Sequence, residues 1–311
     1  MTKKLSIIIP CYNEEKTIRS CLESILNQST ARENYEIIVV DNGSKDNSFS
    51  IASEISDKVI LAPNKKVGAV RNLGALESTA SWIAFVDADC SIDHDWIERA
   101  LRLIKVRPES TFGGGIILPE STNWIERNWL LESESGNVLP KELIGCSIVI
   151  ERNKFLNNRF NEDLSSGEDS ELSQRLRKNS ESVYITRELN VTHLGNAKDL
   201  KTFIDRQAWH AQSYFLSPKR NLKDPVFILI ITTSTSFIAS LVLILLKNPL
   251  WIATLLSAIA LPLLLTLKRY TRAKAVPKSF SDFLKSYTLD VAYIFGRAKG
   301  IVKKLTKIIS N

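Results

Sequence analysis

Two carboxylates separated by one residue, Asp87 and Asp89, are the part of this chain best suited to metal chemistry. They follow an apolar run, residues 82–86, which predicts a buried strand that ends just before them. Neighbouring negative charges repel each other, and a divalent cation relieves that cost. Mg²⁺ or Mn²⁺ typically combines one or two carboxylates with substrate phosphates. The pair indicates metal-assisted chemistry on a phosphate-bearing substrate, but D-x-D is frequent by chance and needs support elsewhere in the chain.

Two further segments have residue types suited to a nucleoside diphosphate. Asp41 ends a predicted strand and begins a turn, where its carboxylate is well placed to accept hydrogen bonds from a base or a ribose. Arg71 lies in the first turn of a predicted helix, and its guanidinium is a planar, multidentate donor for phosphate oxygens. Each segment also has a structural interpretation: a tight turn for the first, and a glycine-tolerant helix packed on a sheet for the second.

A second acidic cluster, Glu168 and Asp169, opens the helix expected over residues 167–178. Acids in a first helical turn complement the helix dipole, so a purely structural role explains them equally well. The functional interpretation is a general base, which requires one carboxylate at the mouth of the site. Single histidines are more often structural, and His193 is the better candidate of this type for a metal or phosphate ligand.

The elements that would position these residues alternate between strand and helix over residues 1–120, as in βα units. Ligands bind beyond the carboxyl ends of parallel strands, and the clusters at residues 10–15, 41–46 and 87–89 lie at such ends. The first cluster alone is explained equally by a strand end with Asn13 as a helix cap. The expected strands are residues 5–9, 36–40, 59–61 and 82–86, and the expected helices are residues 18–26, 49–55 and 68–76.

Residues 120–200 are less regular. We expect a strand over 144–150, a helix over 167–178, short strands over 183–185 and 191–193, and a helix over 200–216 that lies along a membrane surface. The fold class predicted from all these elements is α/β, with a mostly parallel central sheet flanked by helices.

Composition excludes several classes of protein. The four cysteines form no C-x-x-C pair, which argues against a disulfide scaffold and a structural zinc site. The apolar run at residues 5–9 stops at Pro10, too early for a signal peptide, so the N-terminal half is expected in the cytosol. Residues 1–200 contain 24 Lys and Arg against 30 Asp and Glu, whereas the remainder contains 17 against 4. A basic tail around apolar segments suits anionic lipid better than nucleic acid, for which no module is recognisable.

Two apolar runs near the C-terminus predict a transmembrane helical hairpin. Residues 226–246 and 250–267 each approach the roughly 20 residues that span a bilayer, and neither contains a charge inside. Basic residues flank the pair on both outer sides, so both ends are expected in the cytoplasm. Residues 283–309 mix apolar and basic residues, which predicts an interfacial amphipathic helix or a helical hairpin. The expected domains are a cytosolic catalytic domain (1–220), two membrane helices (221–270) and a basic interfacial tail (271–311).

The order of these clusters resembles the glycosyltransferases of family two, which have the A-type nucleotide-diphospho-sugar fold. The resemblance covers roughly residues 4–200 and rests on five motifs in sequence. They are Ile7 to Glu15, which looks like the opening strand and loop; Asp41 to Asp46, the nucleoside loop; Gly68-x-x-Arg71-Asn72-x-Gly74; Asp87-x-Asp89, the metal motif; and Gly167-Glu168-Asp169, the acidic motif on the acceptor side.

The resemblance implies a role for each motif. Asp41 would contact the base, Arg71 the diphosphate and Asp89 the metal, with Asp169 as catalytic base and Glu168 beside it. The metal would be Mg²⁺ or Mn²⁺, with Asp87 as a second ligand and His193 as a further candidate. The residues expected to bind the nucleotide sugar are Pro10, Tyr12, Asn13, Glu14, Asp41, Gly43, Ser44, Gly68, Arg71, Asn72, Asp87, Ala88 and Asp89.

The function expected on this resemblance is inverting transfer of a single hexose from a nucleoside diphosphate sugar to a membrane-associated acceptor, such as a polyprenyl-linked glycan in polysaccharide biosynthesis. The chain lacks the Q-x-x-R-W motif of processive synthases, because Arg206 to Trp209 has related residues in another order. Two alternatives stay open: a polyprenyl-phosphate sugar synthase, and a catalytically silent membrane scaffold. Membrane lipids are expected partners and nucleic acid is not; the oligomeric state, the sugar and the base are undetermined.

Overall fold

The structure is a computed structural model that describes residues 3–133, 136–211, 214 and 223–310. The described residues fall into two compact units. The first unit lies within residues 1–120 and 139–195, and the second within residues 121–138 and 196–311. The second unit therefore contains residues 121–138 and the segment from residue 196 onward together with the C-terminal helices. The boundary at residue 220 between a catalytic domain and the membrane helices remains a prediction.

The first unit is built on a seven-stranded sheet with the order β11-β6-β10-β4-β1-β2-β3. Its N-terminal half is parallel, as predicted: Ile8 of β1 pairs with Ile38 of β2 on one side and with Phe85 of β4 on the other. These strands are β1 (Leu5–Cys11), β2 (Tyr35–Asp41), β3 (Lys58–Leu61) and β4 (Trp82–Phe85).

The other half of the sheet contains one antiparallel strand. β10 (Ile148–Glu151) runs antiparallel to β4 and to β6 (Thr111–Gly113), whereas β11 (Val183–Ile185) is parallel to β6. The strand expected over residues 144–150 is shorter than predicted at its start. Ser147 donates its backbone N–H to the carbonyl of Ile144 at 3.0 Å, and this turn delays the strand to Ile148.

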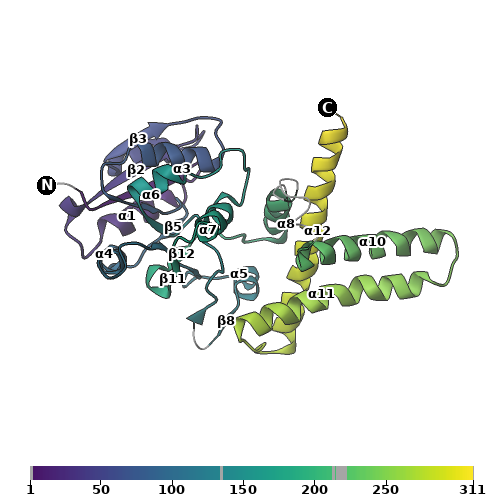
Figure 1. The fold of residues 1–311 in the computed structure, drawn as a ribbon. Helices are drawn as coiled ribbons and strands as arrows, with labels where there is room; N and C mark the ends of the chain where they lie inside the picture. The colour runs from purple at the N-terminus through teal and green to yellow at the C-terminus, as the bar shows by residue number, and fades with distance from the viewer. Residues whose placement is uncertain (1–2, 134–135, 212–213, 215–222, 311) are drawn as a thin grey trace. The chain divides into compact units, whose positions relative to one another are not determined.

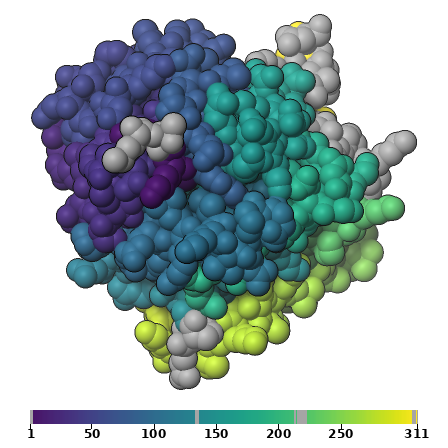
Figure 2. Space-filling view, turned by 60° about the vertical axis from the view of Figure 1, so that its left-hand side comes forward, coloured from purple at the N-terminus to yellow at the C-terminus, as the bar shows by residue number. Residues whose placement is uncertain are grey.

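Helices cover both faces of the sheet (Figure 1). Ile7 and Ile9 of β1 join one apolar core, and Ile8, between them, joins the other, because successive strand residues point to opposite faces. The first core is closed by α1 (Ile18–Leu26), α2 (Ser48–Ile55) and α4 (Trp96–Val106), and the second by α3 (Val67–Leu76), α6 (Arg152–Asn157) and α7 (Glu168–Lys178). The segments of the first unit form one continuous surface (Figure 2).

A second, smaller sheet was not predicted as a sheet. It has the order β5-β12-β7, formed by β5 (Cys90–Ser91), β12 (Val191–His193) and β7 (Ile116–Ile117). Short 3-10 turns, η1 (Arg32–Asn34) and η2 (Arg187–Leu189), precede β2 and β12.

In the part of the second unit that the structure describes, the regular elements are helices and one small strand pair, β8 (Glu132–Ser133) and β9 (Gly136–Asn137). α10 (Pro225–Leu245) and α11 (Trp251–Ala273) form the predicted hairpin and are the two described helices long and apolar enough to cross a membrane. Only 17% and 22% of their most apolar windows are buried, which is unlike core helices of a soluble protein.

Three other helices complete this unit: α5 (Trp124–Trp129), α8 (Leu200–His210) and α12 (Phe280–Ile309). α12 is one uninterrupted helix of 30 residues, so the hairpin alternative for residues 283–309 is wrong. No proline interrupts it, and its inner face packs on neighbouring helices along its length. For the helix expected over 200–216, α8 ends at His210, and residues 212–213 and 215–216 lie outside the described residues.

Candidate active site

Two predicted loops are hydrogen-bonded to each other at the carboxyl ends of β1 and β2. Asn13 has a φ of +55°, a left-handed conformation that asparagine tolerates better than most residues. Its backbone N–H donates to Ser44 Oγ at 2.9 Å, and its side-chain Oδ1 accepts from the N–H of Lys45 at 2.8 Å. Asn13 and Ser44 therefore hold the two loops in register rather than lining the cavity described below.

Asp41, the last residue of β2, is completely buried. Its Oδ1 accepts from the backbone N–H groups of Gly43 and Ser44 at 2.9 and 2.8 Å. Gly43 has a φ of +82°, and a Cβ there would lie 2.9 Å from Pro63 Cβ, so only glycine fits this turn. The other oxygen, Oδ2, is buried without a hydrogen-bond partner among the described residues. A buried acceptor without a partner is costly unless a ligand satisfies it.

The helix α3 is tied to the segment before α7. Asn72 Nδ2 donates to the carbonyl of Phe160 at 2.9 Å, and its Oδ1 accepts from the N–H of Phe160 at 3.0 Å. Gly68 faces the same segment, since a Cβ there would lie 3.2 Å from the carbonyl oxygen of Asn161. Both predicted nucleotide-binding residues thus contact the protein scaffold in this structure.

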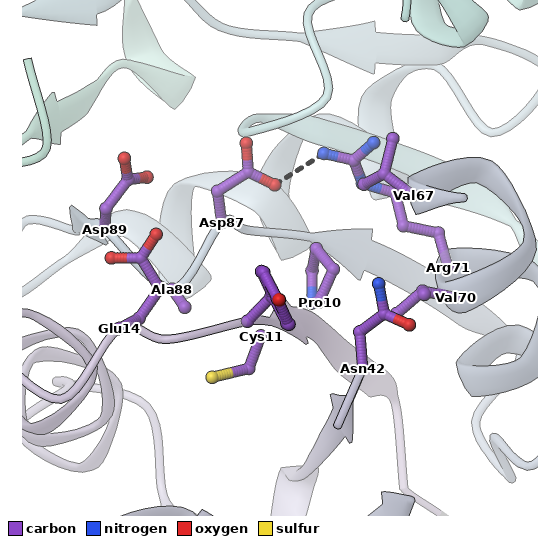
Figure 3. A pocket seen from close by; sticks show the side chains of 11 residues that line it. Pro10, Cys11, Glu14, Asn42, Val67, Val70, Arg71, Asp87, Ala88 and Asp89 are labelled. Atoms are coloured by element: carbon purple, nitrogen blue, oxygen red, sulfur yellow. Dashed lines mark hydrogen bonds and ion pairs between the residues drawn. The ribbon is translucent and has the colours of Figure 1, made fainter. Parts of the chain in front are cut away.

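Arg71 joins two of the predicted carboxylates. It donates from Nη2 to Asp87 at 2.6 Å and from Nη1 to Glu168 at 2.5 Å, with 4% of its side chain exposed. Burial disfavours its charge, but Asp87 and Glu168 outweigh burial and raise the pKa of Arg71, which keeps it cationic. Burial also raises the pKa of the Glu168 carboxyl above its usual range, although the charge of Arg71 opposes this shift. Figure 3 shows the guanidinium directed at Asp87 across the cavity.

Asp89 points away from this cluster and meets His193. The small sheet sets His193 of β12 opposite Cys90 of β5, and the Nε2 of His193 lies 3.6 Å from Asp89 Oδ2. The potential ligand atoms of Asp89, Cys90 and His193 all lie within 4.8 Å of one another. A hydrogen bond with Cys146, together with burial, raises the pKa of the Cys90 thiol well above its usual range. Thiolate is a soft ligand, which Mg²⁺ and Mn²⁺ accept less readily than oxygen.

The Asp89 carboxylate suits Mn²⁺ or Mg²⁺ when substrate oxygens complete the coordination, and the His193 imidazole lies beside it as a further possible ligand. The structure therefore fits the predicted cation at Asp89. Asp87, the predicted second ligand of the cation, is instead paired with Arg71 in this structure.

The neighbours Glu168 and Asp169 have different surroundings. α7 begins after Gly167, and Glu168 turns inward to Arg71. Asp169 is half-buried, and its Oδ2 accepts from the backbone N–H of Gly145 at 2.8 Å. Glu168 is thus a buried, paired carboxylate, whereas Asp169 is a partly accessible one.

A cavity of about 300 Å³ opens beside these groups (Figure 3). Seven predicted site residues line it: Pro10, Tyr12, Glu14, Arg71, Asp87, Ala88 and Asp89. Four further lining residues were not predicted from the sequence: Cys11, Asn42, Val67 and Val70. Cys11 and Asn42 lie inside predicted motifs, so they could have been found as neighbours of predicted site residues. The two valines have side chains without functional groups, and nothing in the sequence marks them.

The part of the chain that contains these strand ends and the lining carboxylates matches a known protein family. The family model described as "Glycosyl transferase family 2" matches residues 6–163. The chain belongs to glycosyl transferase family 2. The match begins in β1, and it includes Asp41, Arg71, Asp87 and Asp89 but ends before the acidic motif at Glu168.

Curated relatives in the family match part of the chain. It is 36% identical over 118 residues to glycosyltransferase AglE of Haloferax volcanii, which covers 36% of this chain and 39% of that protein. It is 42% identical over 106 residues to the putative glycosyltransferase EpsH of Bacillus subtilis, covering 32% and 30%. The matched region thus spans less than half the length of these relatives.

Solved structures share the fold along more of the chain. The mannosyltransferase PcManGT of Pyrobaculum calidifontis, in complex with GDP-Man and Mn²⁺, has a TM-score of 0.62 at 16% identity, covering 98% of this chain and 88% of that one. TarS 1–349 of S. aureus has a TM-score of 0.51 at 19% identity, covering 93% and 91%. At these identities the likeness shows the fold, which is the A-type glycosyltransferase fold predicted from the sequence.

Proposed function

We propose that this protein is a metal-dependent, inverting glycosyltransferase that moves one hexose from a nucleoside diphosphate sugar to an acceptor at a membrane. The observation that carries the proposal is the cavity at the carboxyl ends of β1, β2 and β4. Asp89 lines this cavity and lies 3.6 Å from His193, and Asp41 at the end of β2 offers a buried, unpartnered oxygen. The pair is a cation site, and the Asp41 oxygen is an acceptor for an N–H of a base.

The charge balance of the site supports a cation. Asp87, Asp89 and Glu14 line the cavity, with Arg71 as its one cationic lining residue, and Arg71 is already paired with two carboxylates. A diphosphate entering this acidic site would be repelled unless positive charge came with it. Asp89 and His193 would hold a divalent cation, which when bound would supply that charge and stabilise the leaving diphosphate. TarS was also solved with UDP-GlcNAc, and PcManGT with GDP-Man and Mn²⁺, which supports a donor of this class.

The proposed transfer is a single displacement. The acceptor hydroxyl oxygen bonds to the anomeric carbon as the bond from that carbon to the diphosphate oxygen breaks. The hydroxyl proton passes to the carboxylate of Asp169, and the nucleoside diphosphate leaves. Glu168 is the weaker candidate for the base because its carboxylate is buried and bound to Arg71. Its proposed role is to hold Arg71 at the cavity.

The proposed setting is the cytoplasmic face of a cell membrane. α10 and α11 would cross the bilayer, with the N-terminal unit and the C-terminal tail in the cytoplasm. An anchored site meets a lipid-linked acceptor at high effective concentration, which favours an acceptor such as a polyprenyl-linked glycan.

The test is a screen of nucleotide sugars with the full-length protein in lipid nanodiscs and Mn²⁺. We expect one donor to bind and to be turned over slowly to its nucleoside diphosphate, and faster with lipid-linked glycan present. Product analysis should show one sugar added with inversion. Binding without turnover across donors and acceptors would contradict the enzymatic proposal and favour a silent scaffold.

A further inference from the structure

The outer face of α12 carries a continuous row of exposed apolar side chains. They are spaced at three, four, seven or eleven residues, which places them on one side of a helix. The set, here called the outer stripe, consists of Phe280, Leu284, Val291, Phe295, Val302 and Leu305. Their exposed fractions range from 41% at Val291 to 81% at Phe280. At about 1.5 Å per residue, the stripe runs along most of a helix about 45 Å long.

The opposite face of α12 is packed against α8. Gly296 and Gly300 permit this close approach, since a Cβ at Gly296 would lie 2.7 Å from the carbonyl oxygen of Ile204 and one at Gly300 would lie 2.2 Å from that of Ala208. Leu289, fully buried, lies on the same side. At about 100° per residue these three positions are on roughly the opposite side of the helix from the outer stripe.

The outer stripe and the hairpin of α10 and α11 lie on the same side of α12. α11 crosses α12 near one end, where Arg269 of α11 pairs with Asp290 of α12 at 2.9 Å and Thr266 donates to the same carboxylate at 2.7 Å. In Figure 1, α8 lies on one side of α12, and the turn between α10 and α11 lies on the other. The outer stripe, facing away from α8, therefore faces the direction in which the apolar hairpin extends.

We propose that the outer stripe of α12 rests on the headgroup and upper acyl layer of an anionic phospholipid bilayer, the same bilayer that the hairpin enters. An apolar face beside basic residues is the pattern of an interfacial helix. Lys285, Lys299 and Lys303 flank the stripe along one edge. Lys285 pairs with Asp282 at 3.4 Å and Lys299 with Asp205 at 2.7 Å, and anionic headgroups would complement the basic charge that remains along this edge. This inference rests on the hairpin's entering a bilayer and is independent of the proposed chemistry.

The N-terminal end of the stripe has further interfacial character. A cavity of about 410 Å³ there is lined by Trp124, Ser281, Leu284, Lys285 and Thr288. Tryptophan and lysine beside exposed leucine are residue types enriched where protein meets the membrane interface. A second copy of this chain is the other possible cover for a helical apolar stripe. In such a dimer the lysines along the edge of one stripe would lie near those of the partner helix, and their positive charges would repel each other.

The test uses the full-length protein in nanodiscs of phosphatidylcholine and phosphatidylglycerol. One variant carries an environment-sensitive fluorophore at Val302→Cys, on the stripe. The matched control carries it at Arg206→Cys, an exposed position of α8 on the side opposite Ile204 and Ala208, which pack on α12. Nitroxide-labelled lipid should quench the probe at position 302 strongly and at 206 weakly, with the opposite order for aqueous iodide. Phe295→Asp should reduce lipid quenching at 302.

Equal quenching at the two positions would overturn the proposal. A second result would also overturn it: position 302 is protected from iodide, lipid does not quench it, and pyrene placed there forms excimers between two chains. That combination would show that a second copy of the chain covers the stripe. Both positions are exposed, so labelling does not disturb the packed face, and the readout does not depend on enzymatic activity.

Discussion

Arg71 of α3 and Glu168 of α7 form an ion pair at 2.5 Å, with only 4% and 6% of their side chains exposed, although 97 residues separate them. The same guanidinium holds Asp87 at 2.6 Å. One buried cation thus connects the end of β4, a helix on the sheet and the start of the acidic motif.

Removing Arg71 should destabilise the first unit strongly. Arg71→Met leaves the buried Glu168 carboxylate without its cation, and breaking a buried pair in this way typically costs about 3–5 kcal/mol. Adding Glu168→Gln should recover part of this loss, because the uncompensated charge is gone. Denaturant unfolding of the two single variants and the double variant measures the coupling. Strictly additive effects would show that the pair contributes no mutual stabilisation.

Asp89 should be required for metal-dependent turnover. Asp89→Ala removes the proposed carboxylate ligand, so activity should fall to background and Mn²⁺ binding, measured by electron paramagnetic resonance, should weaken. Asp93→Ala is the matched control, because Asp93 is a nearby acid paired with Arg99 on the surface. EDTA should abolish the activity of the unsubstituted protein, and added Mn²⁺ should restore it. Full activity in EDTA would refute the metal assignment.

Asp169 should act as the general base. Asp169→Asn keeps the shape and removes the proton acceptor, which should lower kcat by about 10²–10⁴. Donor affinity should hardly change, because the proposed donor contacts lie at Asp41, Arg71 and the metal. Glu171→Gln, on the same helix but paired with Arg175, is the control and should remain active. Near-normal turnover of Asp169→Asn with an inactive Glu168→Gln would move the role to Glu168.

The thiol of Cys11 should be inert at neutral pH despite its place at the cavity. Burial, reinforced by the negative charge of Asp41, raises its pKa to about 12. Since only the thiolate is alkylated, iodoacetamide at pH 8 should modify Cys11 about 10³-fold more slowly than in the unfolded chain. The rate should still rise about tenfold per pH unit above pH 8, because the folded-state pKa is far higher. Peptide mapping by mass spectrometry gives the rate, and rapid native labelling of Cys11 would contradict this pKa.

The turn of the hairpin should reach the far side of the membrane. The four native cysteines are buried, so an introduced cysteine is the selective target of an impermeant maleimide. Asn248→Cys should be labelled in intact cells, whereas Lys274→Cys, after α11, should react only once the cells are permeabilised. Labelling at Lys274→Cys in intact cells would reverse the predicted orientation.

Several elements were predictable because their signals are local. β1 and β4 are short apolar runs, and α10 and α11 are long ones, so segment length and composition were sufficient to identify them. The five motifs were likewise readable in order, and the carboxyl-end rule placed three of the polar clusters at one edge of the sheet before the structure was known.

Tertiary structure decided which of these polar residues meet. Sequence spacing pairs Asp87 with Asp89, but the fold turns Asp87 to Arg71 and Asp89 to His193. The small sheet that aligns His193 with Cys90 consists of two- and three-residue strands, too short to have a periodicity of their own. Such strands are stabilised by partners distant in the chain, and a buried charge takes the partner that the packed backbone places within reach.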